Sequence, residues 1–198
     1  MSASTPLSGR NALVLGVERP AGRRAAVALA EAGADVAVVT ISEDTKAEFA
    51  ANSTANEFWA LGRKGIVLTS DGRETTVAEA IADATAELGP ISILVWHAPH
   101  PLRRETLAGL RSDPAIVVLV GDDDAPHGAR ALVAWTRELA GRGLRANALI
   151  ASRRAADAMG PAIKEHRADE AMGVATAVVY LASDASAAIE GAVLVAEA

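Results

Sequence analysis

The fold is decided by residues 11–40, which read NALVLGVERPAGRRAAVALAEAGADVAVVT. The unbroken apolar run at 12–15 is typical of a parallel strand that is covered on both faces. A turn containing glycine follows, then a helical pattern that continues to Ala32, and then a second apolar run at 36–39. Gly33 is expected to end the helix. The stretch therefore predicts a strand–helix–strand unit of the kind that binds dinucleotides.

The turn after the first strand decides whether a pyrophosphate can bind. Backbone N–H groups converge at a helix N-terminus, and glycines there let a phosphate approach closely. Gly16 and Gly22 occupy the first and last glycine positions of a Gly-x-x-x-Gly-x-Gly loop, but Pro20 occupies the middle one. Proline suits the first turn of a helix, yet it has no N–H and its ring takes space that a phosphate would use. Glu18 adds a negative charge that Arg19 offsets only in part, so the sequence predicts the turn and leaves dinucleotide binding open.

Composition limits the class of protein. The chain of 198 residues is 51% apolar and has a net charge of −6 and no cysteine. This length allows one domain, residues 1–198, with a full core and no disulfide or thiol chemistry. The negative charge gives no reason to expect nucleic acid or an anionic membrane as a partner. No apolar run approaches a membrane span and the N-terminus is polar, so we expect a soluble, cytoplasmic protein.

The rest of the chain continues the alternation of strand and helix. Strands are expected at 65–69, 91–96, 116–120, 144–150 and 192–195, and helices at 43–61, 71–88, 129–140 and 171–182. The crossover between Pro101 and Pro114 has room for about two helical turns, close to the minimum for parallel strands. The pattern predicts an α/β fold, a Rossmann-like, doubly wound parallel sheet of about seven strands with helices on both faces.

Several segments, in fixed order, resemble the short-chain dehydrogenase/reductase family. They are LSGRNALV (7–14), ALAEAGADV (28–36), ELGPISILV (87–95), LVAWTRELA (132–140), RGLRANA (142–148), LASDA (181–185) and IEGAVLV (189–195). The resemblance spans nearly the whole chain. It implies descent from enzymes that reduce carbonyls or oxidise alcohols with NAD(P)(H).

The catalytic residues of that family have no counterparts here. The family uses a Tyr-x-x-x-Lys pair, in which the lysine lowers the pKa of the tyrosine, together with a serine and an asparagine. The only tyrosine of this chain is Tyr180, and the residue four positions later is Asp184. The resemblance instead puts Ala125 and Ala129 at the tyrosine and lysine positions. We therefore predict no catalytic residue, and whether the chain is an enzyme stays open.

Some cofactor-binding features remain. By resemblance, Gly16 and Gly22 would approach the pyrophosphate, Asp71 would meet the adenine, and Arg19 is a basic residue seen in members that prefer NADP. The second strand ends at Thr40 instead of an acid, so it offers no carboxylate to a ribose 2′-hydroxyl. NADP or NAD is possible, with NADP favoured. Alternatively, Asp71 only caps the helix that follows it, and Arg19 only pairs with Glu18.

A second set of residues could form a site by topology. His97 and His100 follow the fourth strand, and Asp122, Asp123 and Asp124 follow the fifth. Neighbouring parallel strands end at the same edge, so these groups could converge on a divalent metal. Three consecutive acids are more often a solvated turn, so we do not predict a metal site. His127 could replace the missing tyrosine as an acid–base residue.

The leading hypothesis is a non-catalytic subunit or scaffold. The short crossover removes a helix that carries one subunit interface in the family, whereas the other interface, from Ala171 to Ala198, is kept. We expect a homo-oligomer, or a hetero-oligomer with an active relative, through that segment. The alternatives are an NAD(P)(H)-dependent oxidoreductase with unusual catalytic residues and a sensor that binds a nucleotide without turnover.

Overall fold

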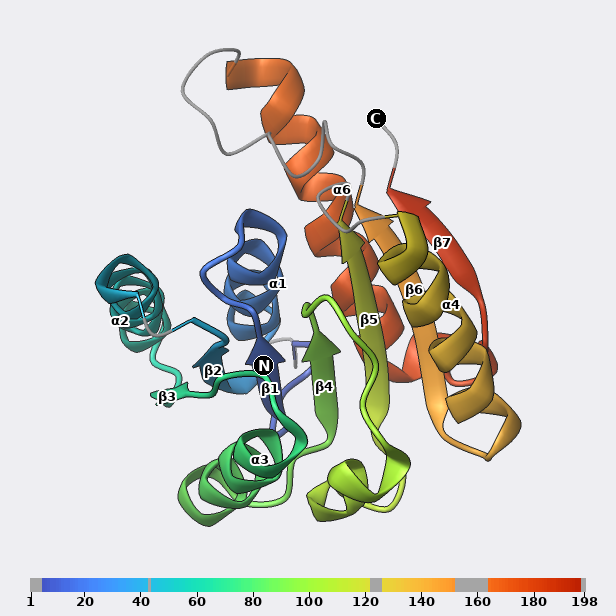
Figure 1. Ribbon diagram of the computed structural model, residues 1–198. Helices are drawn as coiled ribbons and strands as arrows, with labels where there is room; N and C mark the ends of the chain where they lie inside the picture. The colour runs from blue at the N-terminus through green and yellow to red at the C-terminus, as the bar shows by residue number, and fades with distance from the viewer. Residues whose placement is uncertain (1–4, 43, 122–125, 152–163, 197–198) are drawn as a thin grey trace.

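The computed structural model describes residues 5–42, 44–121, 126–151 and 164–196. Within these residues seven strands form one parallel sheet in the order β3-β2-β1-β4-β5-β6-β7 (Figure 1). Their bounds are β1 (Asn11–Leu15), β2 (Asp35–Thr40), β3 (Gly65–Thr69), β4 (Ile93–Trp96), β5 (Ala115–Gly121), β6 (Arg145–Ala151) and β7 (Val193–Ala196). The strand order reverses direction between β1 and β4, as in a doubly wound sheet. The predicted fold is confirmed.

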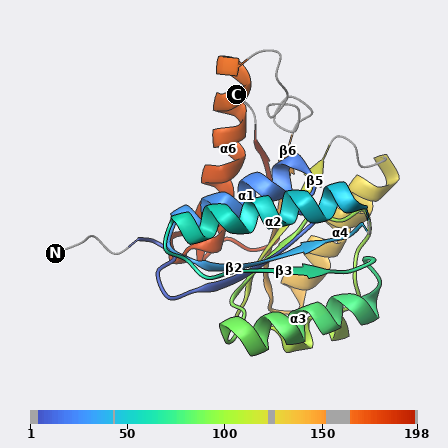
Figure 2. The same ribbon diagram turned by 90° about the vertical axis from the view of Figure 1, so that its left-hand side faces the viewer.

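Helices cover both faces of the sheet. One face carries α1 (Pro20–Glu31), α2 (Thr45–Ala60) and α6 (Lys164–Ala182), and the other carries α3 (Glu74–Leu88), the short 3₁₀ helix η1 (Arg104–Gly109) and α4 (Pro126–Gly141). Figure 2 shows α1, α2 and α6 on one side of the sheet and α3 on the other. A second 3₁₀ turn, η2 (Asp184–Ser186), precedes β7. No helix of the described residues is long and apolar enough to cross a membrane.

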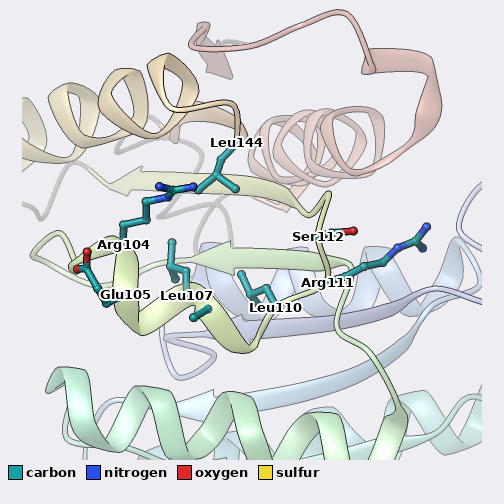
Figure 3. Close-up of a pocket in the computed structure, with 8 residues that line it drawn as sticks. Arg104, Glu105, Leu107, Leu110, Arg111, Ser112 and Leu144 are labelled. Carbon is teal, nitrogen blue, oxygen red and sulfur yellow. The ribbon is translucent and has the colours of Figure 1, made fainter.

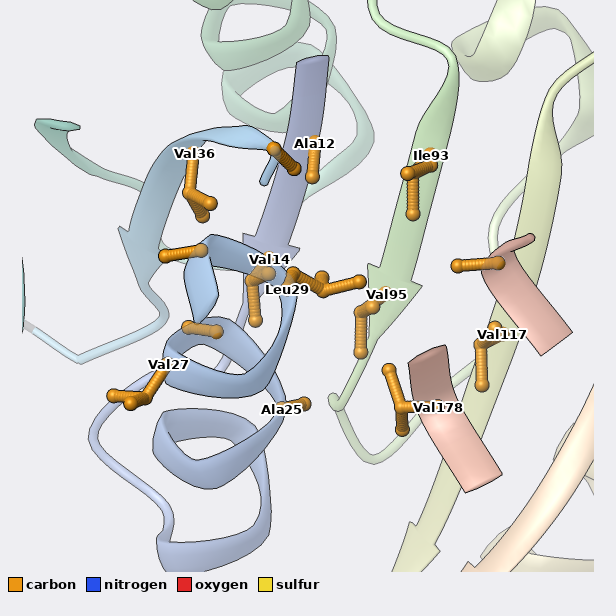
Figure 4. Packing of buried hydrophobic residues seen from close by; sticks show 14 of the residues in the cluster. Ala12, Val14, Ala25, Val27, Leu29, Val36, Ile93, Val95, Val117 and Val178 are labelled. Carbon is orange, nitrogen blue, oxygen red and sulfur yellow. The ribbon is translucent and has the colours of Figure 1, made fainter. Parts of the chain in front are cut away.

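Strand β1 shows why its sequence is apolar without alternation. Its residues 12–15 are fully buried, and they divide between two cores. Val14 packs in the core that also contains Leu29 of α1 and Val178 of α6 (Figure 4). Leu13 belongs to the core under α3 and α4, with Ile81. Both faces of this central parallel strand are buried from residue 12 onward, so residues 12–15 are all apolar.

Four helices begin at positions that the apolar periodicity did not predict. Helix α4 begins at Pro126, three residues earlier than expected. Helix α2 begins at Thr45 because the Asp44 side chain accepts a hydrogen bond from Lys46 N, 3.1 Å away, and caps it. Helix α3 begins only at Glu74, because Asp71 belongs to the turn before it. Helix α6 begins at Lys164, seven residues earlier than expected. The charged run that opens α6 lacks apolar spacing but has good helix formers, which is why the pattern missed it.

The crossover between β4 and β5 is as short as predicted and contains only η1 as regular structure. Leu107 of η1, together with Leu102 and Leu110, covers the core next to Trp96. The backbone comes so close to α3 that a Cβ at Gly109 would lie 2.8 Å from Ile81 Cγ2. A six-residue helical turn thus closes a face that a full helix would otherwise cover.

Candidate functional site

The candidate site is the crevice at the carboxyl ends of the strands, beside the point where the strand order reverses. Ligands of doubly wound sheets bind at this place. Four segments reach it, namely the β1–α1 turn, the residue after β2, the β3–α3 loop and the segment after β4.

The glycine turn is built by close packing. Gly16 has φ +79°, and a Cβ there would lie 2.1 Å from the backbone oxygen of His97. A Cβ at Gly22 would lie 2.2 Å from the backbone oxygen of Gly16. Both glycines are therefore required by contacts within the protein, whether or not a phosphate binds.

Pro20 is accommodated as the first residue of α1, as predicted. Arg23 N donates to Arg19 O at 3.0 Å and begins the helical hydrogen bonds. The N–H groups of Ala21 and Gly22, in the first turn, have no acceptor within the helix. Proline therefore removes one donor and leaves two that could meet an anion.

Glu18 lies where the sequence did not suggest a role. Its Oε1 accepts a hydrogen bond from Ile41 N, 3.2 Å away, directly after β2. Its Oε2 is buried, and no described group bonds to it. The Thr40 hydroxyl is also fully buried without a hydrogen-bond partner in the described structure. The end of β2 and the β1–α1 turn bonded to it thus each hold one unsatisfied polar group. The spacing of residues in the sequence did not predict this.

His97 is buried behind the turn and is 4% exposed. Burial, and secondly the positive charge of Arg19, lower its pKa to about 3. A Cβ at Gly22 would lie 3.2 Å from His97 Nδ1, which has no hydrogen-bond partner within the described residues. The imidazole is therefore neutral near pH 7 and fills space beneath the turn.

His100 has different neighbours from His97. Its ring stacks on Trp96 with centroids 6.4 Å apart, and its backbone oxygen accepts from Trp96 Nε1 at 3.0 Å. A Cβ at Gly72, in the β3–α3 loop, would lie 3.6 Å from His100 Cε1. The described part of the chain holds no group of three residues able to ligate a metal. The other residues of the metal hypothesis, Asp122, Asp123 and Asp124, lie outside the described residues. The side chain of His127, the possible acid–base residue, also lies outside them.

Asp71 is engaged in local hydrogen bonds. Its Oδ1 accepts from Thr76 Oγ1 at 2.7 Å and from Arg73 N at 2.9 Å, and its Oδ2 lies 3.0 Å from Arg73 Nε. The Thr76 and Arg73 hydrogen bonds lower the pKa of the carboxyl. Asp71 therefore orders the turn before α3, but it does not cap that helix, whose N-cap residue is Arg73 without a side-chain cap hydrogen bond. The alternative role as a helix cap is wrong, and the contact with adenine stays a prediction.

The only tyrosine lies at the opposite end of the strands from the crevice. Tyr180 is near the end of α6, and it is 40% exposed. Arg145, the first residue of β6, donates to Ser183 O at 2.8 Å, so the end of α6 meets the amino ends of the strands. The crevice lies at their carboxyl ends.

A pocket beside η1 is separate from the crevice. It has a volume of about 310 Å³ and is lined by leucines and charged residues, among them Leu107, Leu110, Leu144, Arg104 and Arg111 (Figure 3). Arg111 N donates to Ile91 O, two residues before β4, which puts the pocket near the amino ends of the strands. It contains none of the residues that the sequence singled out.

The fold defines the class of the protein, a Rossmann-like α/β protein with a doubly wound parallel sheet. Solved structures share its fold. A blue fluorescent protein from a metagenomic library, solved with NADPH, has a TM-score of 0.74 at 20% identity, covering 96% of this chain and 97% of that one. A short-chain dehydrogenase from Mycobacterium paratuberculosis bound to NAD has a TM-score of 0.73 at 18% identity, with the same coverage.

The sequence comparisons narrow this class. No family model matches the sequence. The 2-dehydro-3-deoxy-D-gluconate 5-dehydrogenase of Escherichia coli is 36% identical over 102 residues, which are 51% of this chain and 38% of that enzyme. A cyclohexanol dehydrogenase of Rhodococcus is 33% identical over 106 residues, 50% of this chain and 39% of the enzyme. The chain thus matches less than half the length of these curated relatives. The chain is therefore similar in fold to solved short-chain dehydrogenases and, over about half of its own length, similar in sequence to curated dehydrogenases.

Proposed function

We propose that this chain is a non-catalytic protein of the short-chain dehydrogenase fold, which acts as a subunit or scaffold and pairs with itself or with an active relative. The observation that carries the proposal is the position of Tyr180. Reduction of a carbonyl delivers a hydride to the carbon and needs a proton donor beside the carbonyl oxygen. The only phenol of the chain, on Tyr180, lies at the amino ends of the strands, and the crevice lies at their carboxyl ends.

His97 is a poor substitute for the tyrosine. A general acid works best when its pKa is near the working pH. The pKa of His97 is about 3 and its side chain is buried, so at neutral pH it is a neutral imidazole, which is a very weak acid. This supports loss of catalysis over an oxidoreductase with unusual residues.

The surface from Ala171 to Ala198 suits pairing. Strand β7 is the last strand of the sheet and pairs only with β6 among the described strands. The edge strand of a sheet presents backbone N–H and C=O groups that another chain can pair with. Its apolar residues Val193 and Leu194 are only half-buried.

The test combines assembly with turnover. We expect the purified chain, alone or mixed with an active relative, to form a defined oligomer by sedimentation velocity and to oxidise neither NADH nor NADPH with carbonyl substrates. Leu194→Lys on β7 should dissociate the oligomer. Leu68→Lys on β3, the other edge strand, is the matched control and should leave it intact. Turnover that survives careful purification would contradict the non-catalytic proposal, and equal effects of the two lysine variants would contradict the proposed surface.

A second candidate is a protein that binds a nucleotide without turnover. It is favoured by the two unsatisfied polar groups, Glu18 Oε2 and the Thr40 hydroxyl, beside the glycine turn. These groups and the N–H groups of Ala21 and Gly22 suit the adenosine and pyrophosphate parts of a dinucleotide. Calorimetry with NADH and NADPH separates this candidate from a pure scaffold.

A further inference from the structure

We infer that Glu18 is a specificity-determining residue for the adenosine ribose, and that it makes the crevice select NAD(H) over NADP(H). This inference rests on the nucleotide-binding candidate above and goes beyond it by naming the ligand and the residue that selects it. It also reverses the preference for NADP that Arg19 suggested from the sequence.

The first step is the position of the carboxylate. In dinucleotide folds an acid at the end of the second strand accepts a hydrogen bond from the ribose 2′-hydroxyl. Here that strand ends in Thr40. Glu18 comes from the β1–α1 turn instead, but the bond from Ile41 N holds its carboxylate at the end of β2, 3.2 Å from that nitrogen. The turn supplies the acid that the strand lacks.

The second step is the unused hydrogen-bonding capacity. Glu18 Oε2 and Thr40 Oγ1 are buried without a hydrogen-bond partner within the described residues. Buried polar atoms nearly always have a partner, so two unsatisfied ones at the same strand end need an explanation. A ribose with free hydroxyl groups supplies one, because a hydroxyl can donate to a carboxylate and accept from a threonine.

The third step is the choice between the two cofactors. A carboxylate has only acceptors, and a 2′-phosphate also has only acceptors and carries negative charge. Bringing the two together costs binding energy by like-charge repulsion. Arg23 cannot readily relieve the repulsion, because its guanidinium pairs with Glu57 at 2.6 Å. NADP(H) is therefore disfavoured relative to NAD(H).

The test is calorimetry of the full chain with NADH and with NADPH. We expect NADH to bind at least about tenfold more tightly than NADPH. Glu18→Gln keeps the shape and removes the charge, so it should raise the affinity for NADPH and bring the ratio close to one. Glu87→Gln, near the end of α3, is the matched control, because it removes an exposed carboxylate at the amino ends of the strands and should leave the ratio at the wild-type value.

Several outcomes would overturn the inference. They are NADPH binding as tightly as NADH, a ratio unchanged in Glu18→Gln, and no binding of either nucleotide. If Glu18→Gln does not fold, Glu18→Asp serves instead, since the shorter acid cannot reach Ile41 N and should lower NADH affinity. Turnover is measured on the same samples. The binding ratios test the role of Glu18, and only observed hydride transfer would contradict the non-catalytic proposal, so the two failures can be told apart.

Discussion

The two halves of the crevice differ in what they retain. The half formed by the β1–α1 turn and β2 has a glycine turn, first-turn N–H groups and two unsatisfied polar groups, on Glu18 and Thr40. The half after β4 has a buried, neutral His97 and a His100 stacked on Trp96. The first half can offer hydrogen bonds to a ligand, and the second offers no proton near neutral pH from His97.

The difference teaches that binding and proton transfer are separable in this fold. Each half is carried by a different connection, one after β1 and one after β4, and both rest on the same buried strands. Substitutions in one connection can therefore remove chemistry without unfolding the sheet. The halves meet where His97 packs against the turn, and the closest approach is between Gly16 and the backbone of His97.

Breaking that contact should have the largest effect. We expect Gly16→Ala to lower the free energy of unfolding by about 3–5 kcal/mol, because the new Cβ would overlap the His97 carbonyl and φ is positive. Gly62→Ala is the control, since Gly62 has φ +71° with nothing within 4 Å of a Cβ, and it should cost only about 1–2 kcal/mol. Denaturant unfolding measures both. Equal losses would show that the two halves are not packed against each other as described.

Acid should reveal the burial of His97. Its folded pKa of about 3 lies below the usual 6.5, so the unfolded chain binds a proton that the folded chain does not. The neutral His97 contributes fully to the free energy of unfolding above pH 6.5. This contribution is lost as the pH falls towards 3, by about 1.4 kcal/mol for each pH unit. Between pH 6.5 and 5 the wild type should therefore lose about 2 kcal/mol more than His97→Gln. Urea unfolding at the two pH values measures this, with His100→Gln as the control that should behave like the wild type; a slope that persists in His97→Gln would assign it to other groups.

Much of the fold was predictable from the sequence, because most of the strands contain apolar runs and a glycine marks the end of the first helix. The run at 12–15 and the stop at Gly33 are examples, and both occur in the structure. The start of α6 was missed because a charged run carries no apolar period.

The site was less predictable, because its features depend on contacts between distant segments. Glu18 looked like an unfavourable charge in an anion-binding turn, and only the fold shows it bound to Ile41 N. Likewise His97 and His100, three residues apart, seemed able to share a metal, yet one packs beneath the turn and the other stacks on Trp96. Residue spacing cannot reveal which way two neighbouring side chains point.

The smallest expected effect concerns the unsatisfied hydroxyl in the binding half. Thr40→Val removes a buried hydroxyl that has no partner in the described structure, so it should raise the free energy of unfolding by about 1 kcal/mol. The matched control is Thr136→Val on α4, whose buried hydroxyl donates to Leu132 O at 2.9 Å and whose loss should cost about 1 kcal/mol. If the hydroxyl serves a ligand, Thr40→Val should also weaken NADH binding while it stabilises the protein, and Thr136→Val should leave binding unchanged. A Thr40→Val protein that is less stable would mean that the hydroxyl has a partner in solution, and the crevice would then lose one of its two unsatisfied groups as a reason to bind a nucleotide.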